Sequence, residues 1–323
     1  MIKAFNEKFI TKESLPYCID FVIPGFEKSY PNGIFKCPSY SNSPSKKWFL
    51  SFVDRIKNTI GKEFLPVYRM GDGEFQICVG FHYRYRKKNE KIWHYMLGKF
   101  RAVLLHYCKK ILKRRITFKK SGWTNADYTS EEIKSLKTNY QKQLRFIAKN
   151  GVLSLKFSYR ESSGFTQQYI VSMVEWFKRH NIKLDYQNYI PVYFIYAMLT
   201  GPFRHEIYQN RRILVITSYD ETKRKAIIEG LKREGVVNIQ FIPLSKGRSM
   251  YDKIDLSLIQ KPIDIVLVGA GVGSSNILCQ LKPLNTVAID VGYIIECLAN
   301  PERKKERTFC CPDEEKNGDY HPI

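Results

Sequence analysis

Two acidic residues, Asp72 and Glu74, lie on either side of Gly73 directly after an apolar run. If the backbone stays extended there, residues i and i+2 point to the same side, so both carboxylates can converge on one hard cation. Mn²⁺ or Mg²⁺ held in this way would bridge the protein to the diphosphate of a sugar nucleotide and neutralise charge on the leaving group. On their own these three residues are more typical of an ordinary turn, so the rest of the chain must decide between the two.

A second candidate site is the glycine-rich stretch DIVLVGAGVGSSNILCQLKPLNTVAID at residues 264–290. Its glycines Gly269, Gly271 and Gly273, followed by Asp290 after the next apolar run, imitate a dinucleotide-binding fingerprint. Ser274 stands where the third glycine of that fingerprint is expected, and any tight turn from a strand to a helix favours glycine. A structural turn and a phosphate or ribose site therefore both remain open here.

The elements that must position these residues are clearest in the last third of the chain, where apolar runs and amphipathic stretches alternate. This alternation predicts right-handed βαβ units and an α/β, Rossmann-like parallel sheet with helices on both faces. We expect strands at 212–219, 238–244, 264–271 and 286–290 and helices at 220–235, 248–260, 274–282 and 292–300.

The first half of the chain is less regular. Apolar spacing predicts helices at 46–60, 129–151, 167–180 and 189–203 and strands at 63–70 and 152–157. Five prolines before residue 46 exclude long regular elements there. We therefore expect an irregular arm at 1–45, one domain at 46–300 and a polar tail at 301–323.

Basic residues are concentrated in one part of the chain. The formal net charge is +22, and residues 81–120 contain fourteen Lys or Arg against a single acid, Glu90. Such a surface attracts nucleic acid, an anionic membrane face or phosphorylated substrates, or it is simply a solvated face. Apolar residues recur every three or four positions at 92–116, which predicts an amphipathic helix. We expect its apolar face to pack in the core, with a bilayer interface as the alternative.

The stretch VYRMGDGEF at 67–75 resembles the Arg-x-Gly-Asp-Gly-Glu signature of the GT-D type glycosyltransferases, whose metal motif is Asp-x-Glu. The closing strands and helices from residue 212 to residue 300 also resemble the closing βαβ series of that family. The resemblance implies that Asp72 and Glu74 hold Mn²⁺ or Mg²⁺ and the donor diphosphate, and that Arg69 positions phosphate or the acids.

The same resemblance assigns roles around the glycine-rich turn. It implies that Gly269, Gly271 and Gly273 shape the nucleotide side of the cleft, and that Asp290 borders it together with Gly292. Tyr293 stands where some members of the family carry His, so a third metal ligand at that position stays open.

Three further residues are candidates with plainer alternatives. Lys246 and Arg248 can clamp a diphosphate, although such side chains in loops are usually solvated. Glu296 lies one helical turn after Tyr293 and is a candidate base, as is Asp290, although a residue at the edge of the core is the simpler interpretation of Glu296.

These observations predict a glycosyltransferase of the hexosyltransferase type that uses a nucleotide-diphospho-sugar and a growing surface glycan, protein-bound or lipid-linked. Scattered cysteines without a Cys-x-x-Cys pair, no signal-like segment and no long apolar window predict a cytoplasmic protein, with peripheral contact to the anionic inner membrane face. We expect no nucleic-acid partner. The alternatives are a nicotinamide- or SAM-binding Rossmann enzyme and a basic nucleic-acid-binding protein.

Overall fold

The structure is a computed structural model of the 323-residue chain. It describes residues 44–71, 74, 93, 96–97, 100–101, 103–104, 108, 116–117, 127–128, 130–155, 176–177, 179–182, 184, 187–201, 203–292 and 294–300. The expected arm lies outside these residues except for its last two positions, which open the first described helix. The expected tail also lies outside them.

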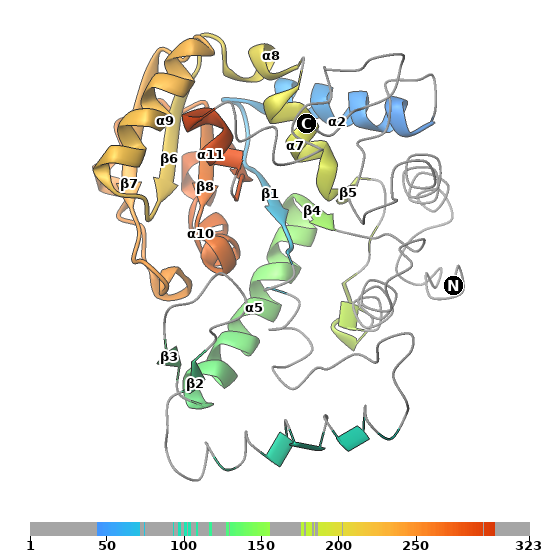
Figure 1. The fold of residues 1–323 in the computed structure, drawn as a ribbon. Coiled ribbons are helices and arrows are strands. Elements are labelled where there is room, and N and C mark those ends of the chain that lie inside the picture. The colour runs from blue at the N-terminus through green and yellow to red at the C-terminus, as the bar shows by residue number, and fades with distance from the viewer. Residues whose placement is uncertain are drawn as a thin grey trace.

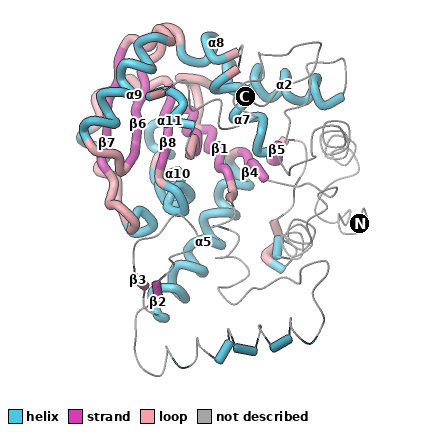
Figure 2. The backbone as a smooth tube through the Cα atoms, in the orientation of Figure 1, coloured by secondary structure: helices cyan, strands magenta, loops and turns pink. Residues whose placement is uncertain are grey.

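A seven-stranded, all-parallel sheet forms the centre of the fold (Figures 1 and 2). Its spatial order is β5-β4-β1-β9-β8-β6-β7. The strands are β1 (Leu65–Arg69), β4 (Val152–Leu155), β5 (Tyr189–Pro191), β6 (Arg212–Thr217), β7 (Asn238–Pro243), β8 (Ile265–Gly269) and β9 (Val287–Asp290). The predicted α/β, Rossmann-like sheet is confirmed. A separate two-stranded ribbon pairs β2 (Ile116–Thr117) with β3 (Asp127–Tyr128).

Helices cover the sheet on both faces (Figure 1). The bounds of the α-helices are α2 (Pro44–Thr59), α5 (Ser130–Asn150), α7 (Val192–Thr200), α8 (Arg204–Tyr208), α9 (Glu221–Arg233), α10 (Ser274–Gln280) and α11 (Ile294–Ala299). On one face α5 and α10 pack against each other and against β1, whereas on the other α11 packs against α9 and α7. The strands at the centre are therefore buried on both sides, which explains their unbroken apolar runs.

The strand order brings distant parts of the chain together. From β1 the chain moves outward through β4 to β5. It then crosses to β6, continues to β7 at the far edge, and returns through β8 to β9, which pairs with β1. The first and last strands of the sheet are thus neighbours at its centre. In open α/β sheets ligands bind at the carboxyl ends of strands, where the connections leave in opposite directions.

The helix expected at 248–260 is the clearest error of the sequence analysis. The segment instead contains two short 3-10 turns, η2 (Ser249–Tyr251) and η3 (Leu256–Leu258). The Asp255 carboxylate accepts hydrogen bonds from both the backbone N–H and the hydroxyl of Ser257, which competes with helical bonding. Amide side chains of α10 also donate to the carbonyl of Asp252, so the segment is fixed by its neighbour.

Two other expected helices are modified. The segment 189–203 begins with strand β5 and becomes helical only at Val192, as α7. In the segment 92–116 the described residues up to Cys108 are helical, but Ile116 belongs to β2. Within the described part of the chain, every helix is too short or too polar to cross a lipid bilayer.

Candidate functional site

The carboxyl edge of the sheet carries a row of polar side chains. Arg69 ends β1 and lies opposite Ser154 of β4, and Asp290 ends β9. Thr217 ends β6, two strands further along the same edge. Parallel pairing places these strand ends side by side, so residues far apart in sequence share one edge.

Glu74 lies at this edge, close to Arg69. Its side chain is only 5% exposed, and Oε2 accepts a hydrogen bond from the backbone N–H of Gly71 at 3.0 Å. A Cβ added to Gly71 would meet Glu74 Oε2 at 2.9 Å and Arg69 Nη1 at 3.7 Å, so both side chains pass over Gly71. Burial raises the pKa of Glu74 to about 7, with Arg69 opposing the rise and Asp290 adding to it.

Asp290 is the second buried carboxylate of this cluster and is 1% exposed. Its Oδ1 accepts hydrogen bonds from the Ser274 hydroxyl at 3.0 Å and from the Gly292 N–H at 3.1 Å. Burial raises the pKa of Asp290 to about 6, although Arg69 and these hydrogen bonds oppose the rise. The structure therefore brings Arg69, Glu74 and Asp290 together as one charged cluster, hereafter the carboxyl-edge cluster.

Gly292 and Tyr196 position the guanidinium of Arg69. Gly292 has a φ of +49°, and a Cβ added there would lie 2.4 Å from Arg69 Nη2. The guanidinium carbon also lies 5.9 Å from the centroid of the Tyr196 ring. Glycine at 292 is thus required by both its backbone conformation and the close approach of Arg69.

Two hydroxyl groups that accompany the cluster were not predicted from the sequence. Ser154 Oγ and Thr217 Oγ1 are buried without a hydrogen-bond partner among the described residues, and so is Asp290 Oδ2. Buried polar atoms are normally bonded, so unpartnered atoms at a strand edge need an explanation such as a ligand. Ser154 and Thr217 are polar residues near the ends of apolar strands, and that position is the signal which could have identified them.

The described carboxylates fit part of a divalent-metal site. Carboxylate oxygens such as those of Glu74 and Asp290 are ligands that suit Mg²⁺ or Mn²⁺. Asp290 Oδ2 accepts no hydrogen bond from the described residues. Among the described residues, however, no three His, Cys, Asp or Glu side chains group as metal ligands. Asp72, the other predicted ligand, and Tyr293 both lie outside the described residues.

Packing and backbone conformation account for two of the three glycines in the glycine-rich turn. Gly271 has a φ of +55°, and a Cβ on Gly273 would lie 2.2 Å from Ser249 Oγ. Gly269 ends β8 beside Thr217, with 3.5 Å between its added Cβ and Thr217 Oγ1. The helix that follows, α10, is only seven residues long and begins with Ser274, whose hydroxyl is used by Asp290. These requirements explain Gly271 and Gly273 without a pyrophosphate.

Lys246 and Arg248 lie in the loop after the edge strand β7, and both are exposed. Arg248 forms an ion pair with Glu132 of α5 at 2.5 Å, and its guanidinium lies 5.1 Å from the centroid of Tyr251. Arg248 therefore connects the loop to α5.

Glu296 lies on α11 in a different environment. Its Oε1 accepts a hydrogen bond from the Tyr219 hydroxyl at 2.8 Å and lies 3.7 Å from Lys223 Nζ. These residues line a cavity of about 210 Å³ between α9 and α11, together with Ala226, Ile227, Ala299 and Asn300. Glu296 is thus paired with residues that follow β6.

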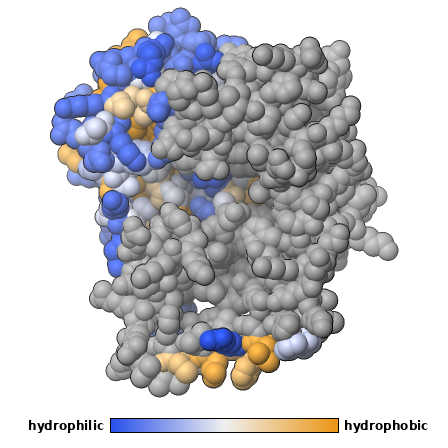
Figure 3. Space-filling view, in the orientation of Figure 1, coloured by the Kyte–Doolittle hydropathy of each residue, from blue (hydrophilic) through white to orange (hydrophobic). Residues whose placement is uncertain are grey.

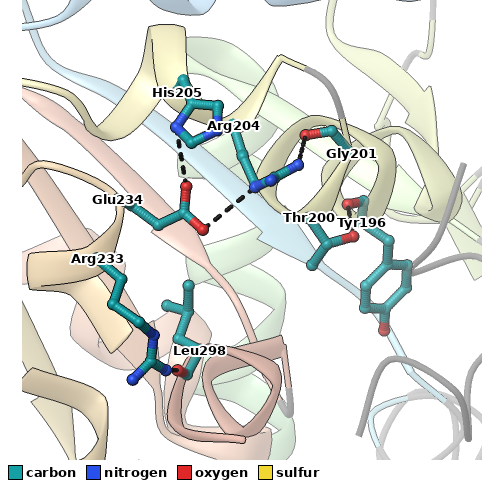
Figure 4. A network of polar contacts seen from close by, with 8 residues as sticks. All are labelled: Tyr196, Thr200, Gly201, Arg204, His205, Arg233, Glu234 and Leu298. Carbon is teal, nitrogen blue, oxygen red and sulfur yellow. Dashed lines mark hydrogen bonds and ion pairs between the residues drawn. The ribbon is translucent and has the colours of Figure 1, made fainter. Parts of the chain in front are cut away.

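A second charged group lies at the opposite, amino edge of the sheet (Figure 4). Arg204 Nε lies 3.2 Å from Glu234 Oε1, and His205 Nδ1 lies 3.1 Å from Oε2 as an ion-pair contact without hydrogen-bond alignment. Arg204 also donates to the Gly201 carbonyl, and Arg233 donates to the Leu298 carbonyl. This group, hereafter the amino-edge network, joins α7, α8, α9 and α11.

Comparison with known proteins identifies the class of the C-terminal part. Residues 159–298 match the model of the GT-D-like family, described as a GT-D fold-like domain. This segment, which ends in α11, is similar to a GT-D-like domain, a fold of the glycosyltransferase type, and the predicted resemblance is confirmed there. It includes Asp290 and the glycine-rich turn, whereas Arg69 and Glu74 precede it.

A solved structure is also similar to this chain. The solved structure titled "Selenomethionine substituted structure of domain of unknown function 1792 (DUF1792)" is 14% identical, with 83% of this chain and 88% of that chain covered and a TM-score of 0.43. No curated protein matches the sequence.

Proposed function

We propose that this protein is a metal-dependent glycosyltransferase that transfers a sugar, of the hexosyl type, from a nucleotide-diphospho-sugar to a growing surface glycan. One observation carries the proposal: Glu74 and Asp290 are buried with raised pKa values beside Arg69, at the carboxyl edge of a GT-D-like sheet. Strongly perturbed carboxylates at that edge are typical of sites that bind charged ligands.

The proposed metal ligands are Asp72 and Glu74, with Asp290 Oδ2 as an additional acceptor. Mn²⁺ or Mg²⁺, when bound, neutralises the donor diphosphate and stabilises charge on the departing nucleotide. Glu74 is held toward this position by the Gly71 N–H, and Asp290 is oriented by Ser274 and Gly292. Both carboxylates must be ionised to bind a cation, which the charge of Arg69 promotes.

Arg69 has two roles in this proposal. Without ligand it offsets the charge of the two carboxylates, and with ligand its planar guanidinium offers donors to phosphate oxygens. The absence of a side chain at Gly292 lets the guanidinium approach the backbone closely, and the hydroxyls of Ser154 and Thr217 supply unpartnered polar atoms along the same edge. We assign the nucleotide-side wall to Gly269, which ends β8 beside Thr217, and a peripheral phosphate contact to exposed Lys246.

Glu296 is the candidate general base, with Asp290 as the second candidate. Glu296 lines the cavity between α9 and α11, where a hydroxyl-bearing acceptor has room, and it accepts a hydrogen bond from Tyr219. Asp290 is enclosed and doubly hydrogen-bonded, which suits a ligand-orienting role better than proton abstraction from an acceptor.

The geometry favours this proposal over a nicotinamide- or SAM-binding enzyme. In a dinucleotide site the acid after the second strand must reach a ribose, but Asp290 is buried and its Oδ1 is bonded within the protein. The close approach of Gly273 is made to Ser249. Binding of a nicotinamide or SAM cofactor without metal would support that alternative.

A thermal-shift panel tests the proposal. UDP-, GDP-, CMP- and dTDP-sugars are each added to the full-length chain with and without Mn²⁺. We expect one nucleotide class to raise the melting temperature only with Mn²⁺, and Glu74→Gln to remove the shift. Glu234→Gln in the amino-edge network is the matched control and should keep it. Stabilisation that neither needs metal nor changes in Glu74→Gln would contradict the proposal.

A further inference from the structure

An exposed apolar stripe lies on the helical residues between 93 and 108. Met96, Leu97, Phe100 and Leu104 are 58%, 64%, 68% and 52% exposed. Their spacing of one, three and four positions places them on one side of the helix. We call these four residues the apolar helix face. The expectation that this face packs in the core is wrong for these residues.

The apolar helix face is concentrated in one place on the molecule. Figure 2 draws the helical residues along the lower edge, away from the strands of the sheet. Figure 3 shows orange, hydrophobic residues at that edge with hydrophilic blue ones beside them. Elsewhere in the described part, large exposed apolar side chains are dispersed, at Val237, Tyr251 and Leu258. Clustered apolar exposure of this kind marks an interaction surface.

The charge around this face identifies the kind of partner. Arg101, on the same helical segment, is exposed. Residues 81–120 contain fourteen Lys or Arg and one acid in the sequence. A helix with clustered apolar side chains in a strongly basic segment matches the chemistry of an anionic bilayer, which offers both an acyl layer and phosphate headgroups.

We propose that the apolar helix face docks the protein on the surface of an anionic lipid bilayer. The helix lies in the plane of the interface, and the four apolar side chains enter the boundary between headgroups and acyl chains. The Arg101 guanidinium stays at the level of the lipid phosphates, because long basic side chains place their charge in the polar layer. This inference rests on exposure and charge, and is independent of the glycosyltransferase proposal.

Two other partners fit less well. Nucleic acid accounts for the basic residues and offers stacking partners for exposed Trp93 and Phe100. It gives no role to exposed Met96, Leu97 and Leu104, which offer neither hydrogen bonds nor a ring for stacking. A second copy of the chain can cover an apolar face, but it brings the same excess of positive charge to the contact. An anionic bilayer satisfies both features together.

Vesicle cosedimentation of the full-length chain tests the docking surface. The probes are phosphatidylcholine vesicles with and without phosphatidylglycerol. We expect binding to the phosphatidylglycerol vesicles that weakens with added salt, and little binding to phosphatidylcholine alone. Leu97→Ala with Phe100→Ala should weaken binding at least about tenfold, because two exposed apolar side chains no longer enter the bilayer.

The matched control removes equally exposed apolar side chains elsewhere. The double variant Val237→Ala with Leu258→Ala should leave vesicle binding unchanged. Its melting temperature should be similar to that of the Leu97/Phe100 variant. Equal binding to both vesicle types, or no loss in the Leu97/Phe100 variant, would overturn the proposal. Salt-sensitive RNA binding that requires Phe100 would overturn it too. So would a wild-type protein that does not bind vesicles but forms dimers in analytical ultracentrifugation, if the Leu97/Phe100 variant abolishes those dimers. Metal-dependent nucleotide-sugar binding should be the same in all these variants, so a failure of either proposal is distinguishable.

Discussion

The two edges of the sheet carry charged groups that differ in their ratio of acidic to basic side chains. In the amino-edge network, the Arg204 guanidinium contacts one carboxylate oxygen of Glu234 and the His205 imidazole contacts the other. In the carboxyl-edge cluster, Arg69 acts on two carboxylates, Glu74 and Asp290, whose pKa values are raised by burial.

This difference shows which group serves the fold. The amino-edge network ties the ends of four helices to one another through the Arg204–Glu234 ion pair and through arginine hydrogen bonds to backbone carbonyls. Two buried carboxylates around one guanidinium destabilise the folded chain when both are ionised, and Asp290 Oδ2 has no partner among the described residues. An arrangement that costs stability but collects acidic oxygens at the ligand edge is expected of a functional site.

The largest predicted effect is on stability at alkaline pH. Glu74 has a folded pKa of about 7 against an ordinary value of 4.5. Its stabilising contribution is therefore present below about pH 4.5 and lost as pH rises through about 7, a change of about 3 kcal/mol. Glu74→Gln removes this loss, so urea unfolding with a chelator should show a more stable variant at about pH 8. If the free energy of unfolding changed with pH equally in the variant and the wild type, the pKa of Glu74 would not be raised by burial.

The second prediction concerns a substitution that disrupts the amino-edge network. Arg204→Met leaves Glu234 with only the His205 contact and should lower the free energy of unfolding by about 2 kcal/mol. Urea denaturation measures the loss. Binding of Mn²⁺ should not change, because the network lies at the other edge of the sheet. Weaker Mn²⁺ binding in this variant would show that the two groups are coupled.

The third effect concerns the backbone next to Arg69. Gly292→Ala strains a position with a φ of +49° and displaces the guanidinium, so it should cost about 1 to 2 kcal/mol and also weaken nucleotide-sugar binding. Gly235→Ala is the matched control, because Gly235 has a φ of +82° beside Gln209. Both variants should lose stability, and only Gly292→Ala should lose binding. Equal nucleotide-sugar binding in the two variants would show that Arg69 does not contact the nucleotide sugar.

The smallest effect concerns the hydroxyl of Thr217. Thr217→Val replaces a buried, unpartnered hydroxyl by a methyl group of similar size, which should stabilise the chain by about 1 kcal/mol or less. A ligand that uses this hydroxyl should bind less tightly to the variant. Thermal unfolding with and without nucleotide sugar measures both quantities. A destabilised variant with unchanged binding would mean that the hydroxyl is bonded within the protein.

The sequence predicted the sheet well because its signals are local. β8 and β9 are apolar runs between turn residues. Asp220 is the N-cap of α9, and its side chain accepts a hydrogen bond from the Lys223 N–H. The segment 248–260 has similar apolar spacing but is fixed by amide side chains of α10, a tertiary contact that periodicity cannot reveal.

The candidate site was predicted in part. Glu74 was identified from its position after an apolar run, Arg69 from the resemblance to the GT-D type glycosyltransferases, and Asp290 from the glycine-rich pattern. Their proximity, however, depends on β1 and β9 being neighbours. That pairing joins the first and last strands of the sheet, and no local pattern encodes it. Ser154 and Thr217 were missed because they belong to strands that are otherwise apolar. For the apolar helix face, periodicity predicted the stripe but not its exposure.

Direct titration with Mn²⁺ tests the central claim, that the carboxyl-edge cluster binds a divalent cation. Free Mn²⁺ is followed by electron paramagnetic resonance in the wild type, in Glu74→Gln with Asp290→Asn, and in Glu234→Gln. We predict that the wild type and Glu234→Gln bind Mn²⁺ more tightly as pH rises past about 7, because the carboxylates must lose their protons. The double variant should lose this binding. Binding by the double variant equal to that of the wild type, or wild-type binding that does not change with pH, would contradict the account.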